Sequence, residues 1–443
     1  MRYNILYVLL LFFTSSVFGQ KQWDLEECID YATRNNLDLK TQSLNITAGN
    51  IKRDKAKLNY LPSLVFNTNS QYSAGRSLDP TTHSFVENTN STVNASLNFS
   101  TTLFDGMKRY NNYRKSLADL GVAQSDYETM KDDIALSVTM AYLNVLLNRK
   151  IIASVRSQID ISDTNVNRAK RLLEEGAFTD EKLQNLLVQR NNELYSLADA
   201  EGALKSSVIN LCSLLNLHDY DFFDVKEDTI SIDNSPPISD VISAVGELPQ
   251  MKSARYKIKS AEYDLRLARS DMFPDISLGA AMGSSFSDAR QQHLIDESGV
   301  VYRSYPFINQ MNDNRNSNIS LSLSFPVFGF FQSNKNIALA RHNIQFAQYE
   351  AEKTGNKLID HIWSIYAEIE TARKKYDVAT SSVEKGKIAL KYAGNKLENG
   401  TLTFADYSIE KENVMLAEAQ ALKANYEYRF KIILLKFYYN RYR

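Results

Sequence analysis

Histidine, cysteine and serine are the first candidates for chemistry in this chain, as metal ligands, redox thiols or nucleophiles. The histidines show no metal-ligand spacing and none lies beside a cysteine (His83, His218, His293, His342 and His361). The sequence contains neither a glycine-rich phosphate-binding loop nor the pattern of a nucleophile-elbow serine. These observations predict a protein that is not an enzyme and that uses no metal or other cofactor.

The N-terminus has the features of an export signal. Arg2 precedes an apolar run at residues 5–13, and the small residues Val17 and Gly19 precede a cleavage position before Gln20. The run is too short to cross a bilayer of about 30 Å as a helix. We therefore expect residues 1–19 to be a signal peptide.

Two cysteines, Cys28 and Cys212, remain in the expected mature chain. They could form a disulfide in an exported protein, but nothing in the sequence places them within bonding range. Two buried thiols on helix faces are the simpler interpretation.

Charge and hydropathy exclude two classes of protein. The 443 residues include 51 basic and 52 acidic side chains, so the chain lacks the basic excess that nucleic-acid binding requires. A mean hydropathy of −0.35 with one long apolar run excludes a transporter built from several transmembrane helices.

Two long tracts of the chain contain no proline, 155 residues after Pro80 and 117 residues after Pro326. Because a proline inside a helix costs about 3 kcal/mol, such tracts are typical of long helices.

The chain contains a long internal repeat. Residues 60–64 (YLPSL) match 272–276 (MFPDI) at an offset of 212, and 175–179 (EGAFT) match 399–403 (NGTLT) at an offset of 224. The second half has therefore gained 12 residues, the difference between the two offsets, and they lie between Pro274 and Pro326. We expect a first repeat at 20–217, a linker at 218–243 and a second repeat at 244–443.

Each repeat contains a segment that alternates apolar residues with Ser or Asn, at 93–100 and 319–325. Leu97 and Phe99 lie on the apolar face of the first segment, and Leu321 and Leu323 lie on that of the second. We expect these four residues to face lipid. We expect partner strands at 64–72 and 276–282, with polar connections at 73–91 and 284–316. This pattern is typical of transmembrane strands, although a strand that covers a protein core alternates in the same way.

A very long helix is expected after each strand pair, from about residue 106 to residue 173 in the first repeat. At about 1.5 Å per residue it would be on the order of 100 Å long, too long for a compact domain. We therefore expect the helices to pair as antiparallel coiled coils. Turns are expected at 174–180 and 398–404, where Gly176 and Gly400 suit a left-handed helix end.

The predicted fold is mainly α-helical, with four strands per chain in a membrane β-barrel. A sheet exposed to lipid must close on itself, and the smallest closed barrels have about eight strands. The barrel must then be shared among chains. Two copies would give about eight strands and a filled interior, whereas three would give about twelve and room for a lumen. The polar inner face favours three copies.

These features resemble the TolC-like outer membrane efflux proteins, the exit ducts of tripartite efflux and type I secretion systems. The resemblance covers nearly the whole mature chain and includes the joints at Leu61-Pro62 and Phe273-Pro274, the segments 103–106 (LFDG) and 325–329 (FPVFG), and the glycine-containing turns. It implies a homotrimer in the outer membrane of a Gram-negative type bacterium, with a twelve-stranded β-barrel and a periplasmic α-barrel. The implied partners are a periplasmic membrane-fusion adaptor protein, an inner-membrane efflux pump or ABC exporter, and outer-membrane lipid.

The resemblance also assigns roles at the helical tip. It implies that both turns contact the adaptor, through Gly176, Thr179, Gly400 and Thr403. Many members of the family have two acidic residues that constrict the closed channel. Asp406 fits the first position, but Ile409 occupies the second, so the first turn supplies other candidates for the constriction, Asp180 and Glu181.

Two functions from different classes fit the sequence. The first is a passive channel for export of small molecules or proteins. The second is a non-conducting periplasmic coiled-coil protein with a structural or adhesive role, whose strands only pair chains. Conductance separates them, because only the channel needs a membrane-inserted barrel. The sequence favours the channel but identifies neither its cargo nor its pump.

Overall fold

The structure is a computed structural model that describes residues 22–78, 83–86, 89–220, 223–227, 236–296, 299–327 and 330–441. The expected signal peptide, residues 1–19, lies outside the described residues. The chain forms two compact units. The first comprises Met1–Asn45, Gln124–Lys252 and Glu352–Arg443, and the second comprises Ile46–Ala123 and Ser253–Ala351. The predicted fold, mainly helical with four principal strands, is confirmed.

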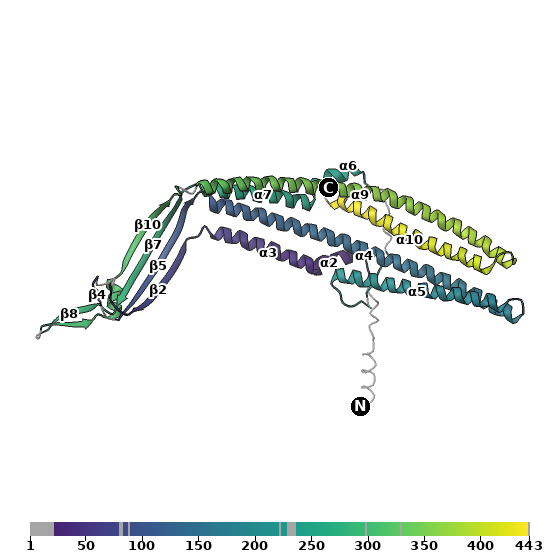
Figure 1. Ribbon diagram of the computed structural model, residues 1–443, viewed down its shortest axis with the longest axis horizontal. Helices are drawn as coiled ribbons and strands as arrows, with labels where there is room; N and C mark the ends of the chain where they lie inside the picture. Colours follow the sequence, from purple (N-terminus) through teal and green to yellow (C-terminus); the bar gives the residue numbers. More distant parts are fainter. Residues whose placement is uncertain are drawn as a thin grey trace, which may run out of the picture. The chain divides into compact units, whose positions relative to one another are not determined.

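The same order of principal elements occurs twice: a helix, a strand pair, a very long helix and a returning helix (Figure 1). The first half contains β1 (Gln22–Trp23), α2 (Leu25–Asn35), α3 (Leu37–Leu58), β2 (Ser63–Ser73), β3 (Ser77–Leu78), β4 (Phe85–Val86), β5 (Asn90–Asp105), α4 (Lys108–Glu174), α5 (Asp180–Leu215) and β6 (Asp224–Val225). The second half contains α6 (Ile238–Ser243), the 3-10 helix η1 (Ala244–Glu247), α7 (Pro249–Ser270), β7 (Asp275–Ser287), β8 (Gln291–Asp296), β9 (Gly299–Ser304), α8 (Phe307–Asp313), β10 (Asn316–Ser324), α9 (Phe330–Glu398) and α10 (Phe404–Arg441).

The four principal strands form one antiparallel sheet in the order β10-β7-β5-β2 (Figure 1). Each repeat supplies one hairpin-like pair, and β5 of the first repeat pairs with β7 of the second along their length. The register between β5 and β7 shifts once, between Thr102 and Phe104, where Leu103 is the extra residue. Strands β2 and β10 are the outer strands of this sheet.

The connections at 73–91 and 284–316, which the sequence predicted to be polar, also contain secondary structure that was not predicted. Residues 284–316 contain the end of β7, the hairpin β8–β9 and the helix α8, and the pair β3–β4 lies within 73–91. Gln310 on α8 is fully buried. Its amide accepts a hydrogen bond from Ser287 N and donates to Ser287 O and Tyr305 O, at 3.0, 2.9 and 2.8 Å. Here polar side chains complete the backbone hydrogen bonding of a packed segment.

The joint between β5 and α4 is a tight turn in the second unit. Gly106 and Met107 both have left-handed backbone angles, with φ of 60° and 68°. The Asp105 carboxylate accepts hydrogen bonds from the backbone N–H and the Nε of Arg109, at 3.1 and 2.9 Å. It therefore satisfies a backbone donor in the first turn of the helix, where anionic groups are stabilising.

The long helices of the first unit form two antiparallel hairpins, α4 with α5 and α9 with α10 (Figure 1). In the first hairpin, Val166 and Ala169 of α4 pack against Leu183 of α5. In the second, Val414 of α10 closely approaches Gly386 of α9, and Lys431 forms an ion pair with Glu368. Among the described residues, none of the helices combines the length and the apolar composition of a membrane-spanning helix.

The main core of the first unit contains both cysteines. Cys28 and Cys212 are completely buried thiols that belong to one cluster with Tyr142 and Leu211. Burial raises the pKa of Cys212 to about 11. Tyr142 is also buried, and its hydroxyl donates a hydrogen bond to Lys226 O at 2.7 Å, next to β6. The interpretation of two buried thiols thus agrees with the structure.

Candidate functional site

The sheet of the second unit has one apolar face. Residues directly opposite each other on neighbouring strands share a face. Leu97 lies opposite Phe66 and Met282, and Phe99 lies opposite Leu64 and Ala280. On the other side of β7, Leu321 lies opposite Leu278, and Leu323 lies opposite Ile276. The four residues that the sequence placed on apolar faces therefore share one face of the sheet, on which most of the opposing residues are apolar.

The opposite face of the sheet is mainly polar or small. Its rows join Asn67, Ser96, Gly283 and Asn316, and also Ser63, Ser100, Gly279 and Ser320. The apolar face is also open in the isolated chain, with Ile319 82% exposed and Leu321 and Leu323 each 69% exposed. A contiguous exposed apolar surface on a folded protein marks a membrane or protein contact.

The two turns of the helical hairpins have the same backbone hydrogen bonds. Gly176 N–H donates to Leu173 O and Ala177 N–H to Leu172 O, at 3.0 and 2.8 Å. Gly400 N–H donates to Leu397 O and Thr401 N–H to Lys396 O, at 3.0 and 2.9 Å. Both glycines are left-handed, with φ of 73° and 70°. This is the Schellman arrangement, in which glycine ends the helix without steric cost.

The two threonines each stand one residue before a returning helix, but they cap it differently. Thr179 makes no side-chain cap. Thr403 Oγ1 accepts a hydrogen bond from Asp406 N at 3.2 Å and donates to the Asp406 carboxylate at 2.6 Å. Asp406 is exposed, and this contact gives it a local role in starting α10, where an acidic residue is stabilising.

The other acidic candidates lie in the first turn of α5. Asp180 and Glu181 are both exposed, and Asp180 accepts a hydrogen bond from Gln184 in its own helix at 3.3 Å. Among the described residues, no hydrogen bond or ion pair joins either of them to Asp406. Residues of both turns do meet around one cavity of about 460 Å³, which we call the tip cavity. Its lining includes Phe178, Leu186, Gly400, Phe404 and Tyr407.

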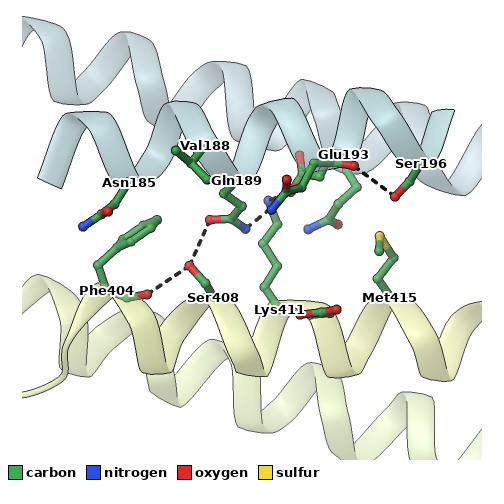
Figure 2. A pocket seen from close by; sticks show the side chains of 12 residues that line it. Asn185, Val188, Gln189, Glu193, Ser196, Phe404, Ser408, Lys411 and Met415 are labelled. Carbon is green, nitrogen blue, oxygen red and sulfur yellow. Dashed lines mark hydrogen bonds and ion pairs between the residues drawn. The ribbon is translucent and has the colours of Figure 1, made fainter. Parts of the chain in front are cut away.

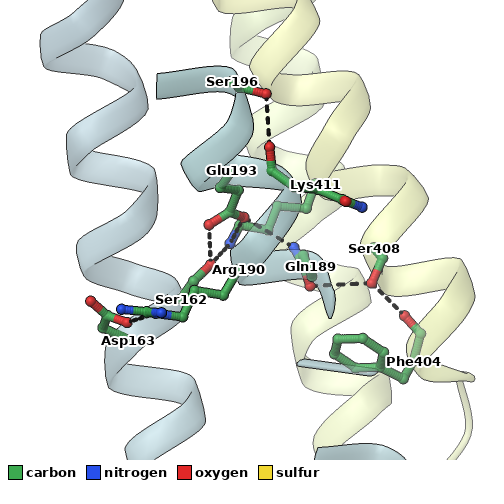
Figure 3. Close-up of polar contacts among 10 residues, drawn as sticks. Ser162, Asp163, Gln189, Arg190, Glu193, Ser196, Phe404, Ser408 and Lys411 are labelled. Carbon is green, nitrogen blue, oxygen red and sulfur yellow. Dashed lines mark hydrogen bonds and ion pairs between the residues drawn. The ribbon is translucent and has the colours of Figure 1, made fainter. Parts of the chain in front are cut away.

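A buried polar cluster near the tip was not predicted from the sequence. We call it the inter-repeat network, and it consists of Ser162 of α4, Glu193 of α5 and Lys411 of α10 (Figure 3). Lys411 Nζ donates to Glu193 Oε1 at 2.8 Å and to Ser162 Oγ at 2.5 Å. Ser162 in turn donates to Glu193 Oε2 at 2.5 Å. The ion-paired side chains are 3% and 6% exposed.

A cavity of about 300 Å³ lies beside this network, between α5 and α10 (Figure 2). Most of its lining residues are polar, and they include Asn185, Gln189, Asn192, Ser196 and Ser408. Ser408 Oγ lies 3.2 Å from Gln189 Oε1, and Gln189 Nε2 donates to Glu193 at 3.3 Å. Burial raises the pKa of the neighbouring Tyr407, and the Glu193 carboxylate raises it further.

Only one weak signal in the sequence marks this network. Glu193 stands in a heptad column with Leu186 and Ala200, seven residues away on each side, so it interrupts apolar positions. Its partner Lys411 is 218 residues away in the chain. A charged residue in such a column normally indicates a solvated helix edge.

We expect Lys411→Met to destabilise the protein strongly, because it leaves the buried Glu193 carboxylate without its counter-charge. Breaking a buried ion pair from one side costs roughly 3–5 kcal/mol. Arg156→Gln is the matched control, since it removes a largely exposed pair with Glu201, and such pairs contribute roughly 0–1 kcal/mol. Unfolding in guanidinium, followed by helical circular dichroism, measures both variants. Equal midpoints for the two variants would contradict the buried-pair assignment.

Known proteins are similar to this protein over most of the chain. The family model described as outer membrane efflux protein matches residues 28–217 and 243–437. A Haemophilus influenzae protein described as uncharacterized is 24% identical over 296 residues, which are 64% of this chain and 62% of that protein, so the chain spans less than two thirds of that relative. Toxin and drug export protein A of Aggregatibacter actinomycetemcomitans is 19% identical over 92% of this chain and 84% of its own length.

Among solved structures, the outer membrane protein VceC of Vibrio cholerae has a similar fold, with a TM-score of 0.77 and 13% identity. The match covers 94% of this chain and 96% of that chain. At such identity the likeness concerns the fold. The family match, however, extends over far more than half of the residues and includes both hairpins and the sheet. The chain therefore belongs to the outer membrane efflux protein family.

Proposed function

We propose that this protein is a passive exit channel in the outer membrane of a Gram-negative type bacterium. In this proposal three copies form the channel, and a periplasmic adaptor links it to an inner-membrane efflux pump or ABC exporter that supplies the energy. The observation that carries the proposal is the two-faced sheet, apolar and exposed on one side and polar on the other. Lipid outside and water inside require this distribution.

Closure of the sheet supports the number of copies. In lipid, an open sheet edge would leave amides without hydrogen-bond partners, at a cost of several kcal/mol per group. One chain supplies the four strands β10-β7-β5-β2, so three chains supply twelve if β2 of each copy pairs with β10 of the next. A barrel of that size has a lumen, which the polar face of the sheet would line.

The helices next to the outer strands also have surfaces suited to a second copy. Leu37, Leu44, Ile51 and Leu58 recur every seven residues along α3 and are 59% to 67% exposed. On α9, Leu339 and Phe346 are seven residues apart and also exposed. Heptad rows of this kind pack against a neighbouring helix in coiled coils. They therefore support helix pairing between copies.

At the tip, we propose that Gly176, Thr179, Gly400 and Thr403 contact the adaptor, because both turns share one backbone geometry. Asp406, with Asp180 and Glu181, supplies negative charge for the constriction.

The division of the chain is part of the same proposal: a signal peptide at 1–19, repeats at 20–217 and 244–443, and a linker at 218–243. Export of a toxin or drug is named for one relative and supports export as the general activity.

The assembly can be tested by mass. We expect detergent-extracted protein to be a trimer of about 150 kDa, three times the 50.4 kDa chain less the signal peptides, because three copies close the sheet. Light scattering coupled to size exclusion measures this mass. A stable monomer that retains its β-sheet signal would overturn the proposal.

The two faces of the sheet can be tested by arginine substitutions. Leu97→Arg or Leu321→Arg should impair assembly, because a charge facing lipid near the midplane costs roughly 2–4 kcal/mol. Ser96→Arg and Ser322→Arg, on the neighbouring positions of the same strands, should assemble and change single-channel conductance. Equal assembly of all four variants would show that the faces are assigned wrongly.

The proposed effect of the Asp406 charge on the channel can be tested separately from its hydrogen bonds with Thr403 at the start of α10. Asp406→Asn keeps a side-chain oxygen that can accept from Thr403 but removes the charge. If the charge constricts the channel, resting conductance in planar bilayers should rise while the helix content stays unchanged. Glu412→Gln, at an exposed position of the same helix, is the control and should leave conductance unaltered. An unchanged conductance in Asp406→Asn would leave only the capping role.

A further inference from the structure

We infer that Lys411, Glu193 and Ser162 are positioning residues of the tip, which set the axial register of α10 against α5. They would thereby place the Gly400 turn relative to the Gly176 turn. This inference rests on the proposed function of the two turns. It concerns the pairing of the two hairpins within one chain, through contacts that lie outside the residues proposed for the adaptor and the constriction.

The network joins three helices from both repeats. Its ammonium, carboxylate and hydroxyl groups satisfy one another at 2.5–2.8 Å, away from solvent. The neighbouring pair Arg190–Asp163 joins only α5 to α4 and is 34% and 41% exposed, so water can replace either partner. A buried charge lacks that alternative and must meet its counter-charge. The inter-repeat network is thus sensitive to register in a way that the exposed pair is not.

The positions one turn away offer no substitute. A slide of α10 by one turn along α5 would bring Lys411 beside Gln189 or Leu197, neither of which carries a carboxylate. On α4, the positions one turn from Ser162 are Gln158 and Val166, and Val166 is buried. Only the observed register gives the ammonium group a carboxylate, and a single polar residue in a helix interface is known to specify register in this way.

The other polar contacts between α5 and α10 do not specify a single register. Around the cavity between α5 and α10, Asn185, Gln189, Asn192 and Ser196 present amide and hydroxyl groups at successive turns of α5. Ser408 contacts Gln189 in the observed register, but Asn185 or Asn192 could serve it equally well after a slide. Amides and hydroxyls exchange partners because each both donates and accepts. The charges therefore decide the register.

The distance to the tip is short. Lys411 follows Gly400 by eleven residues and Thr403 by eight, along the first turns of α10. A helix is stiff over this length, so a slide of one turn would move the Gly400 turn by about 5.4 Å. The tip cavity is lined by residues of both hairpins, including Phe178 and Gly400, and it would be rearranged by such a shift.

Cysteine cross-linking reads the register directly in the full-length trimer. Gln189→Cys with Ser408→Cys marks the observed register, and Asn185→Cys or Asn192→Cys with Ser408→Cys marks a slide in either direction. We expect disulfide formation in the first pair and at least tenfold less in the other two. The native thiols provide the background, measured without added cysteines. Cys212 contributes little at pH 8, because its pKa is raised to about 11.

The cross-links are then measured in variants of the network. Glu193→Leu combined with Lys411→Met removes both charges, which proteins often tolerate, and should raise the slid cross-links severalfold. The charge-reversed pair Glu193→Lys with Lys411→Glu should restore the original preference. Arg190→Gln with Asp163→Asn removes the exposed pair and should change nothing. Helical circular dichroism and trimer mass confirm folding of each variant.

The results separate this inference from the proposed function. If the folded double apolar variant cross-links only in the observed register, the network does not set it and the inference fails. The inference also fails if the slid cross-links appear equally in the exposed-pair control. Cross-linking does not require conduction, so absence of conductance in the wild-type protein would overturn the proposed channel alone.

Discussion

A sheet that faces lipid must leave no backbone amide unpaired, because hydrocarbon offers no hydrogen-bond partner. Among the described residues, the sheet pairs its backbone between β10, β7, β5 and β2 and leaves one edge of each outer strand unpaired. The apolar side chains of this sheet and the heptad row of α3 are exposed in the single chain. In the proposed channel, lipid and the neighbouring copies would cover them. In the proposed channel, the need to close the sheet therefore determines how many strands, and so how many chains, the barrel contains.

The chain contains two copies of each principal element because its sequence is duplicated, and local sequence gives both copies the same backbone conformation at the helical turns. The glycine turns at Gly176 and Gly400 have the same hydrogen bonds although few of their neighbours are identical. The repeats differ in the connection between their strands and in the cap of the returning helix. The second contains the β8–β9 hairpin and α8 between its strands, and only the second tip helix has the reciprocal Thr403–Asp406 cap.

Much of the fold could be predicted because its signals are local. Alternation at 93–100 and 319–325 gave the correct sheet faces, and the lack of proline after Pro80 gave a helix close to the observed α4. The contact between Glu193 and Lys411 could not be predicted, because it joins residues 218 positions apart and depends on how two hairpins pack. The secondary structure within 284–316 was not predicted from its polar composition, and the amide of Gln310 is buried there against the backbone. Roles at the tip stay predictions, since they depend on partner molecules.

The most direct measurement is an electron cryomicroscopy reconstruction of the protein in lipid nanodiscs. It shows the number of copies, the pairing of strand edges and the face that contacts lipid in a single experiment. We predict three copies, with β2 of each paired to β10 of the next and with Leu97 and Leu321 facing the acyl chains. A sheet with open edges, or one whose apolar rows face inward, would contradict this prediction.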